Sequence, residues 1–331
     1  MNYAAPWWLP GGNLQTIWPA LYARRVKATL PAYQRERWST PDGDFIDVDR
    51  LSPQPVSKGA RGLLVLFHGL EGGSDSHYAQ AFADFATNRG LAYAVPHFRG
   101  CSGEINHAPR AYHSGDYEEI GWILQKIRLT HPGPLWAVGI SLGGNALLRW
   151  AQEAGTEASR SVNGVAAVSS PIDLAAGGMA IGRGFNRLVY TRMFLNTMKP
   201  KALRKWQQFP GLFDKDAMAR ARTLYEFDNI FTAPLHGFKD TVDYWARASA
   251  KPHLRAIQVP TLVVNARNDP FVPASSLPHP SEVGPHVTLW QPECGGHVGF
   301  AQGRFPGHVM AMPETVGQWL LQQSGYTGDH G

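Results

Sequence analysis

Short runs of apolar residues recur along the chain and are separated by longer stretches with helical spacing. The run at 62–67 reads Gly-Leu-Leu-Val-Leu-Phe, which is typical of a parallel strand covered on both faces. Comparable runs predict strands at 91–95, 135–140, 164–168, 261–264 and 287–290. Apolar residues at intervals of three and four predict helices at about 78–89, 116–127, 145–154 and from about 313. This alternation predicts an α/β fold with a right-handed, mostly parallel sheet flanked by helices.

Two departures from this alternation define the organisation of the chain. Segments 33–39 and 45–49 flank Pro41-Asp42-Gly43, whose turn chemistry predicts a hairpin of two antiparallel edge strands. A long helical segment lies between the strand ending near 170 and the one at 261, and long insertions are usually lids or binding elements. We therefore expect an α/β core formed by residues 1–177 and 251–331 and a mostly helical cap insertion formed by residues 178–250.

The first part of the expected cap is both basic and apolar. Residues 178–213 hold seven Lys and Arg side chains and no Asp or Glu, together with many large apolar side chains. The apolar set is expected to line a pocket or a small core. The charges are either an ordinary solvated face or a site for anionic groups, and the sequence leaves both interpretations open.

The strand expected at 135–140 runs directly into Gly139-Ile140-Ser141-Leu142-Gly143, a Gly-x-Ser-x-Gly motif. A serine on a sharp strand-to-helix turn has a strained backbone and projects its hydroxyl above the sheet, while the glycines prevent clashes. The pentapeptide alone also fits a structural Gly/Ser turn. In the context of the surrounding strand and helix, Ser141 is the predicted nucleophile.

A serine hydroxyl becomes an effective nucleophile beside an imidazole whose tautomer is fixed by a carboxylate. Asp269 lies in the turn after the strand at 261–264, and His297 lies in a glycine-bordered loop after the strand at 287–290. The order nucleophile, acid, histidine is the one that folds with this motif use. Asp173, which follows the preceding strand, is the alternative acid.

The oxyanion formed by such a serine needs two fixed N–H donors. The motif places one at the backbone N–H of Leu142 and the other in the loop after the strand at 62–67. Leu70 is the candidate for this second donor, and Glu71 is the alternative. We expect His68 to brace the loop, because His297 already supplies the base.

Composition limits the remaining functions. The 331 residues are 44% apolar and 17% charged, which favours a globular fold over a disordered one. The net charge of +5 comes without a basic arm interleaved with aromatic residues, so nucleic-acid binding is not expected. The sequence contains no phosphate-binding or dinucleotide-binding glycine loop and no His-Glu-x-x-His, and its thirteen histidines are scattered. No cofactor and no metal are therefore predicted.

The N-terminal region and the cysteines bear on location. Cys101 and Cys294 cannot form a disulfide framework, and no export signal or run of 18 apolar residues is evident, so we expect a cytoplasmic protein. The aromatic residues of segment 7–22 precede the basic residues of segment 24–27. Such a segment either packs over the pocket mouth or makes a weak contact with a membrane surface.

Several motifs together resemble one family. They are Asn-Leu-Gln-Thr-Ile-Trp-Pro at 13–19, His-Gly-Leu-Glu-Gly at 68–72, Ser-His-Tyr at 76–78, Phe-Arg-Gly-Cys-Ser-Gly-Glu at 98–104, Tyr-His-Ser-Gly at 112–115, Gly-Ile-Ser-Leu-Gly-Gly-Asn at 139–145, and shorter matches between 227 and 244. With these motifs, nearly the whole chain resembles the α/β-hydrolase superfamily, more narrowly its YheT-like esterase/lipase branch, whose relatives include membrane-anchored lipases of animals.

The resemblance implies a Ser-Asp-His triad on Ser141, Asp269 and His297, and hydrolysis of carboxylic esters with lipid-like or simple acyl groups. We expect no counterpart of the membrane anchor of the animal relatives, and their membrane-lipid substrates are therefore not carried over. Position 97 is His where related sequences often have Asn or Asp, and the sequence offers no physical account of this difference.

These observations predict a serine carboxylesterase that acts on small-molecule esters of short to medium acyl chain length through an acyl-enzyme on Ser141. Three alternatives would use the same scaffold. They are an acyltransferase, a C–C bond hydrolase with the same triad, and a non-catalytic ligand receptor.

Overall fold

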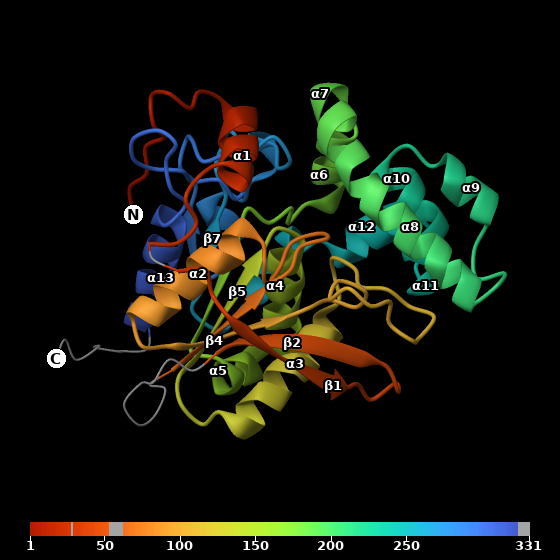
Figure 1. Cartoon of the computed structure of the whole chain (residues 1–331), viewed down its shortest axis with the longest axis horizontal. Coiled ribbons are helices and arrows are strands. Elements are labelled where there is room, and N and C mark those ends of the chain that lie inside the picture. The colour runs from red at the N-terminus through yellow and green to blue at the C-terminus, as the bar shows by residue number, and fades with distance from the viewer. Residues whose placement is uncertain (28, 53–61, 324–331) are drawn as a thin grey trace.

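The computed structural model describes residues 1–27, 29–52 and 62–323, and one eight-stranded sheet lies at its centre (Figure 1). The strand order is β1-β2-β4-β3-β5-β6-β7-β8. The strands are β1 (Tyr33–Ser39), β2 (Phe45–Leu51), β3 (Leu63–Phe67), β4 (Ala92–Pro96), β5 (Leu135–Ile140), β6 (Gly164–Val168), β7 (Thr261–Val264) and β8 (Val287–Trp290). The mostly parallel α/β sheet predicted from the sequence is confirmed.

The antiparallel part of the sheet differs in one respect from the prediction. β1 pairs antiparallel with β2, as the hairpin requires, but β2 also pairs antiparallel with β4. Only β1 of this pair is therefore an edge strand. All other neighbouring strands are parallel.

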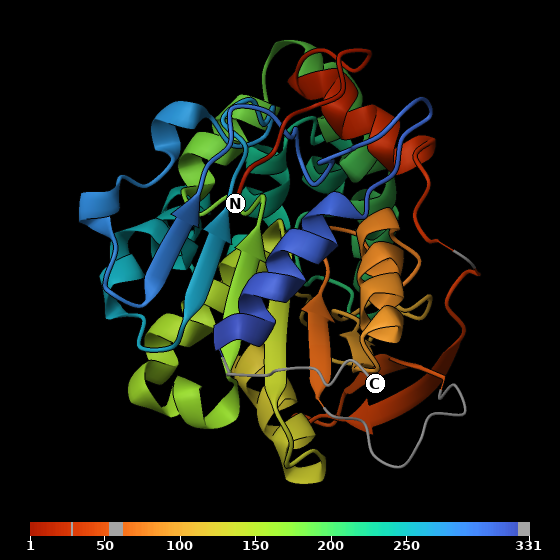
Figure 2. The same ribbon diagram turned by 90° about the vertical axis from the view of Figure 1, so that its left-hand side faces the viewer.

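Helices cover both faces of the sheet. Alternate residues of β3 point to opposite layers: Leu63 and Val65 pack with α3 (Tyr117–Thr130) and α4 (Leu142–Ala154), while Leu64 packs with α2 and α13. Figure 2 shows α2 (His77–Asn88) and α13 (Ala311–Gln323) on the near face of the sheet. Burial on both sides explains why the strands are apolar at consecutive positions.

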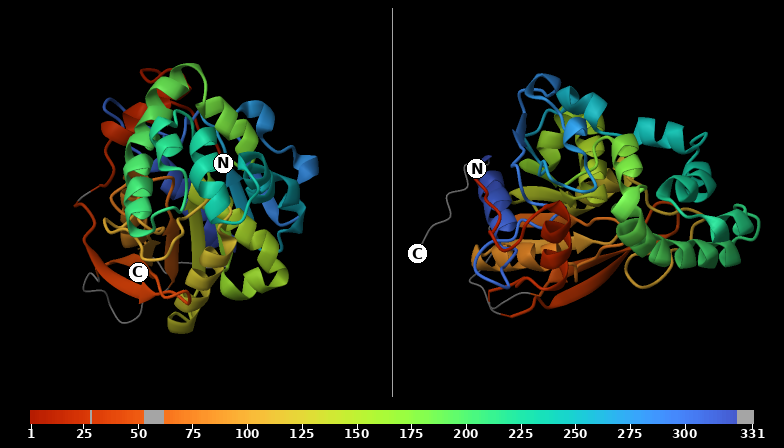
Figure 3. Two further views of the ribbon diagram at one scale, coloured as in Figure 1. Left: turned by 90° about the vertical axis from the view of Figure 1, so that its right-hand side faces the viewer. Right: turned by 90° about the horizontal axis from the view of Figure 1, so that it is seen from above.

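A helical insertion lies between β6 and β7, and Figure 3 shows it projecting from the side of the molecule away from the N-terminus. It contains α6 (Leu174–Ile181), α7 (Gly184–Asn186), α8 (Arg192–Gln208), α9 (Lys215–Arg220), α10 (Leu224–Phe227), α11 (Ala233–Leu235) and α12 (Thr241–Ala248), with π-helical turns at Arg187–Thr191 and Asp228–Thr232. The predicted start of the cap at residue 178 falls inside α6. The predicted core segments also include residues 28, 53–61 and 324–331, which lie outside the described residues.

The helix predicted at 145–154 begins earlier, at Leu142. Its first turn contains Gly143 and Gly144. A Cβ atom on Gly143 would lie 2.4 Å from the carbonyl oxygen of His68, and one on Gly144 would lie 1.9 Å from Ser170 Oγ. The glycines allow the start of α4 to pack directly against the neighbouring strand ends.

Candidate active site

Four loops meet at the carboxyl edge of the parallel strands. They follow β3, β5, β7 and β8 and carry Leu70, Ser141, Asp269 and His297, respectively. Since the carboxyl ends of parallel strands share one edge of the sheet, residues far apart in sequence are brought together there.

Ser141 occupies a strained turn between β5 and α4. Its φ of 52° and ψ of −117° lie in a region that side-chain-bearing residues rarely adopt. The Ser141 N–H donates to the carbonyl of Val168 at 2.8 Å, and a Cβ on Gly139 would lie 2.5 Å from the Gly143 carbonyl oxygen. This close packing holds the serine in the conformation that the sequence motif predicts.

Ser141, His297 and Asp269 form one line of hydrogen bonds. Ser141 Oγ lies 2.9 Å from His297 Nε2, and His297 Nδ1 lies 2.9 Å from Asp269 Oδ2. The Asp269 side chain is fully buried, and its other oxygen accepts from the N–H groups of Phe271 and Val272. With Nδ1–H donating to the carboxylate, His297 Nε2 is left to accept the serine proton.

The structure distinguishes between the two acids that the sequence left open. Asp173 Oδ1 accepts from the Ala176 N–H at 3.0 Å and so caps the first turn of α6. Asp269, not Asp173, is the carboxylate hydrogen-bonded to His297.

Helix α1 (Gly12–Leu21) contributes two side chains that the sequence reasoning did not assign to the site. The His297 N–H donates to Thr16 Oγ1 at 2.9 Å, and Gln15 Oε1 accepts from both the Gly295 N–H and the Asn268 side chain at 2.9 Å. These bonds connect segments more than 250 residues apart, which local spacing cannot reveal. The only signal was that both side chains lie within the 13–19 motif of the family resemblance.

The loop after β3 packs directly on the serine. A Cβ on Gly69 would lie 3.3 Å from Ser141 Cβ, and Leu70 and Leu142 line the same cavity as Ser141. The alternative donor, the Glu71 N–H, already donates to Tyr112 Oη at 3.0 Å. Of the two candidates in this loop, Leu70 is therefore the better placed to supply an oxyanion donor.

His68 braces this loop, as predicted. Its Nδ1 lies 2.8 Å from the Gly69 carbonyl oxygen, and its Nε2 accepts the Phe98 N–H at 3.0 Å. Complete burial lowers the pKa of His68 to about 3, so the ring is neutral and serves both bonds at once.

His97, the position at which the sequence departs from its relatives, also has a structural role. Its Nε2 lies 2.8 Å from Asp49 Oδ2, and both side chains are 4% exposed. This contact fastens the turn after β4 to β2.

A mostly apolar cavity lies between the core and the cap, beside Ser141 and His297. Its walls come mainly from the loop after β6, from the cap and from Phe271, whose ring packs on the His297 ring at 4.1 Å. Besides Leu70 and Leu142, the apolar lining residues are Pro171, Leu174, Ile181, Phe194, Met198, Leu224, Tyr244, Trp245 and Phe271. Such a space suits an apolar group joined to the atom that the serine attacks.

The basic side chains of the cap do not line this cavity. Lys199 donates to cap carbonyls, Lys205 donates to the carbonyls of Asn106 and Ala108, and Lys201 pairs with Glu71. The four arginines between 183 and 204 are exposed. The exposed arginines fit an ordinary solvated face, and the three lysines are already bound to protein groups.

The described residues also bear on membranes and metals. In 1–27, 29–52 and 62–323 no helix is both long and apolar enough to cross a bilayer. Across the same ranges, no group of three or more His, Cys, Asp or Glu side chains is arranged to hold a metal ion. Cys101 and Cys294 are free thiols.

Comparisons with a family model, with related sequences and with a solved structure all indicate the same fold. Residues 62–303 match the family model described as alpha/beta hydrolase fold. The chain is 39% identical to YheT of Escherichia coli (strain K12), named as a candidate esterase, over 93% of this chain and 89% of that protein. It is 27% identical to Phospholipase ABHD3 of Mus musculus, over 87% of this chain and 71% of that protein. The solved structure of the Pyrococcus furiosus esterase Pf2001 superposes with a TM-score of 0.53 at 16% identity, over 92% of this chain and 96% of that one, a likeness of fold.

Proposed function

Because the chain belongs to the α/β-hydrolase family and its YheT-like branch, we propose that this hydrolase is a serine carboxylesterase that forms an acyl-enzyme on Ser141. The observation that carries the proposal is the line of hydrogen bonds from Ser141 Oγ through His297 to buried Asp269, with 2.9 Å at each step. A small-molecule ester is the expected substrate, because an apolar cavity opens beside the reactive hydroxyl.

In the first half of the reaction, Ser141 Oγ attacks the ester carbonyl while its proton passes to His297 Nε2. Asp269 stabilises the imidazolium and keeps Nδ1–H directed at its own carboxylate. The backbone N–H groups of Leu142 and Leu70 hydrogen-bond the oxyanion of the tetrahedral intermediate. His297 then gives the proton to the departing alcohol oxygen, and the acyl group remains on Ser141.

In the second half, water takes the place of the alcohol. His297 Nε2 removes a proton from water as it attacks the acyl carbonyl, and the same donors stabilise the second oxyanion. Collapse of this intermediate returns the proton to Ser141 Oγ and releases a carboxylic acid. We assign the apolar cavity under the cap to the acyl chain.

The test of the nucleophile is labelling with a fluorophosphonate probe, followed by hydrolysis of aryl esters. Wild type should be labelled, and Ser141→Ala should be neither labelled nor active. Ser114→Ala is the matched control, because Ser114 lines the same cavity but its hydroxyl bonds the Asn145 amide. Labelling that persists in Ser141→Ala would refute the assignment.

A panel of acyl chain lengths tests the cavity assignment. Each methylene buried in the cavity should add up to about 0.8 kcal/mol to transition-state binding, or roughly fourfold in kcat/KM, until the cavity is filled. A steep fall beyond about four acyl carbons would contradict the assignment of the cavity to the acyl chain. Adding short alcohols or thiols as acceptors separates hydrolysis from acyl transfer.

A further inference from the structure

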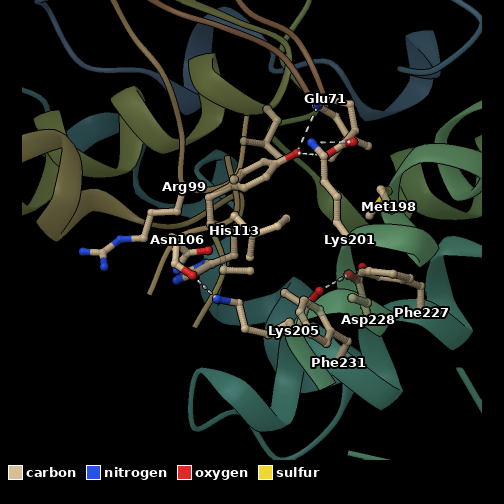
Figure 4. A pocket seen from close by; sticks show the side chains of 18 of the residues that line it. Glu71, Arg99, Asn106, His113, Met198, Lys201, Lys205, Phe227, Asp228 and Phe231 are labelled. Carbon is tan, nitrogen blue, oxygen red and sulfur yellow. Dashed lines mark hydrogen bonds and ion pairs between the residues drawn. The ribbon is translucent and has the colours of Figure 1, made fainter. Parts of the chain in front are cut away.

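The loop that carries Leu70 lines the apolar cavity beside Ser141 and also a second cavity under the cap. One contains Ser141, and the other is lined by Leu70 and Leu142 on the core side and by Met198, Lys201 and other cap residues on the far side. Figure 4 shows this second cavity, with Lys201 reaching from the cap toward Glu71. A side chain of the cap therefore contacts the residue next to the expected oxyanion donor.

Glu71 has an unusual backbone and is held by several contacts. Its φ is 58°, in the left-handed region that side-chain-bearing residues rarely adopt. Its N–H donates to Tyr112 Oη at 3.0 Å, and Tyr112 Oη in turn donates to Glu71 Oε1 at 2.9 Å. A strained residue keeps its conformation only when its surroundings fix it. The conformation of Glu71 therefore helps to fix the course of the loop after β3, which carries Leu70.

Lys201 completes this set of contacts. Its Nζ lies 2.9 Å from Glu71 Oε2, and the Glu71 side chain is only 9% exposed. Without a cation, this carboxylate would be poorly solvated and would move toward water. That movement would break the hydrogen bond between the Glu71 carboxylate and Tyr112 Oη, the same oxygen that accepts the Glu71 N–H.

Among the lysines of α8, this contact is specific to Lys201. Lys199 Nζ donates to the carbonyls of Ala219 and Ala221, which belong to the cap itself. Lys205 Nζ donates to two carbonyls of the segment 106–108. Lys201 alone of the three is paired with the oxyanion loop.

We propose that Lys201 is a positioning residue that couples the seating of cap helix α8 to the geometry of the oxyanion hole. Its ion pair with Glu71 keeps the loop in the conformation that aims the Leu70 N–H at the reacting oxygen. The hole is thus complete when the cap is in place. This inference rests on the proposed esterase function, since it concerns the same site.

The experiment measures kcat and KM on one short aryl ester for wild type, Lys201→Met and Lys201→Arg. Loss of a whole oxyanion donor costs about 10²–10³ in kcat, and we expect its displacement by Lys201→Met to cost on the order of tenfold in kcat with little change in KM. Lys201→Arg should restore most of the lost kcat, because it keeps the charge. Lys199→Met is the matched control on the same helix and should stay within about twofold of wild type.

A second variant changes the other member of the ion pair, Glu71. Glu71→Gln removes the charge that Lys201 pairs with and keeps a hydrogen-bonding partner for Tyr112. It should lower kcat as Lys201→Met does, and the double variant should lose no more than either single one. Equal kcat values for Lys201→Met and Lys199→Met, or multiplied losses in the double variant, would overturn the inference.

The two proposals fail in different ways. An inactive wild type that is not labelled at Ser141 refutes the esterase function. An active wild type whose kcat is insensitive to Lys201 and Glu71 refutes only the coupling. Thermal denaturation of each variant shows whether a lower kcat comes from unfolding. If Lys201→Met is unfolded at the assay temperature, the kcat of Glu71→Gln decides whether the coupling is refuted.

Discussion

The hydrogen bond between Thr16 and the loop that carries His297 offers a direct measure of how much α1 contributes to the candidate site. Thr16→Val keeps the shape of the side chain but removes the oxygen that accepts the buried His297 N–H at 2.9 Å. A buried N–H left without a partner costs about 1–3 kcal/mol. The neighbouring bonds of Gln15 to Gly295 and Asn268 remain, so we expect the cost to appear as a shift of His297 and not as loss of the whole loop.

If the entire cost falls on the transition state, kcat/KM decreases by about 5- to 150-fold. If the cost instead lowers the free energy of unfolding, the melting temperature decreases by roughly 2–4 °C per kcal/mol, the value for proteins of about 150–250 residues. Both quantities are therefore measured, on an aryl ester and by thermal denaturation. Thr16→Ser keeps the hydroxyl and should resemble wild type. If Thr16→Val matches wild type in both measurements, α1 does not position His297.

Four further predictions follow from the same contacts. Asp269→Asn should lower kcat by roughly 10⁴-fold, because an amide favours the wrong His297 tautomer, whereas Asp173→Asn, which only caps α6, should retain wild-type kcat. Burial raises the pKa of Asp228 from 3.8 to about 6. The folded protein therefore binds this proton more tightly than the unfolded chain does. The stability that this proton contributes is fully present below pH 3.8 and is lost as pH rises through 6. Asparagine does not titrate, so the free energy of unfolding of Asp228→Asn should rise relative to that of wild type by up to about 3 kcal/mol as pH increases from 4 to 8, measured by denaturant unfolding. Gly144→Ala should destabilise the fold by about 1–3 kcal/mol or more, measured in the same way, because the new Cβ would meet Ser170 Oγ at 1.9 Å and the Gly139 carbonyl at 2.8 Å. The alternative that segment 7–27 makes a weak contact with a membrane surface is tested by cosedimentation with anionic vesicles, where any such binding should fall with added salt and in Tyr22→Ala.

Much of the fold could be predicted because strands buried on both faces leave a plain signal. The run at 62–67 is apolar at every position because β3 contacts helices on both sides. The start of α4 was placed too late, since glycine usually marks a turn and the close contact of Gly144 with Ser170 is visible only in three dimensions. The predicted start of the cap at residue 178 falls inside α6 (Leu174–Ile181), and nothing in the local sequence marks where this helix begins.

The candidate site was predictable to the extent that its residues follow strand ends. Ser141, Asp269 and His297 each come directly after a strand or in the next loop, so the order of elements was enough to select Ser141 and His297 and to limit the acid to Asp269 or Asp173. The choice between Asp269 and Asp173 needed the hydrogen bond to His297. Thr16 could not be selected by spacing, because its partner lies 281 residues away.

The insertion has one property that bears on how such proteins diversify. The two strands that bound it, β6 and β7, are direct neighbours and pair from Val165 with Thr261 to Val168 with Val264. The chain therefore leaves and re-enters the sheet at adjacent points, and a longer or shorter excursion there need not alter any strand register. Doubling the length of a connection costs only about 0.6 kcal/mol in closure entropy. A different set of helices could be exchanged at this junction, giving a new substrate range to an unchanged reaction centre.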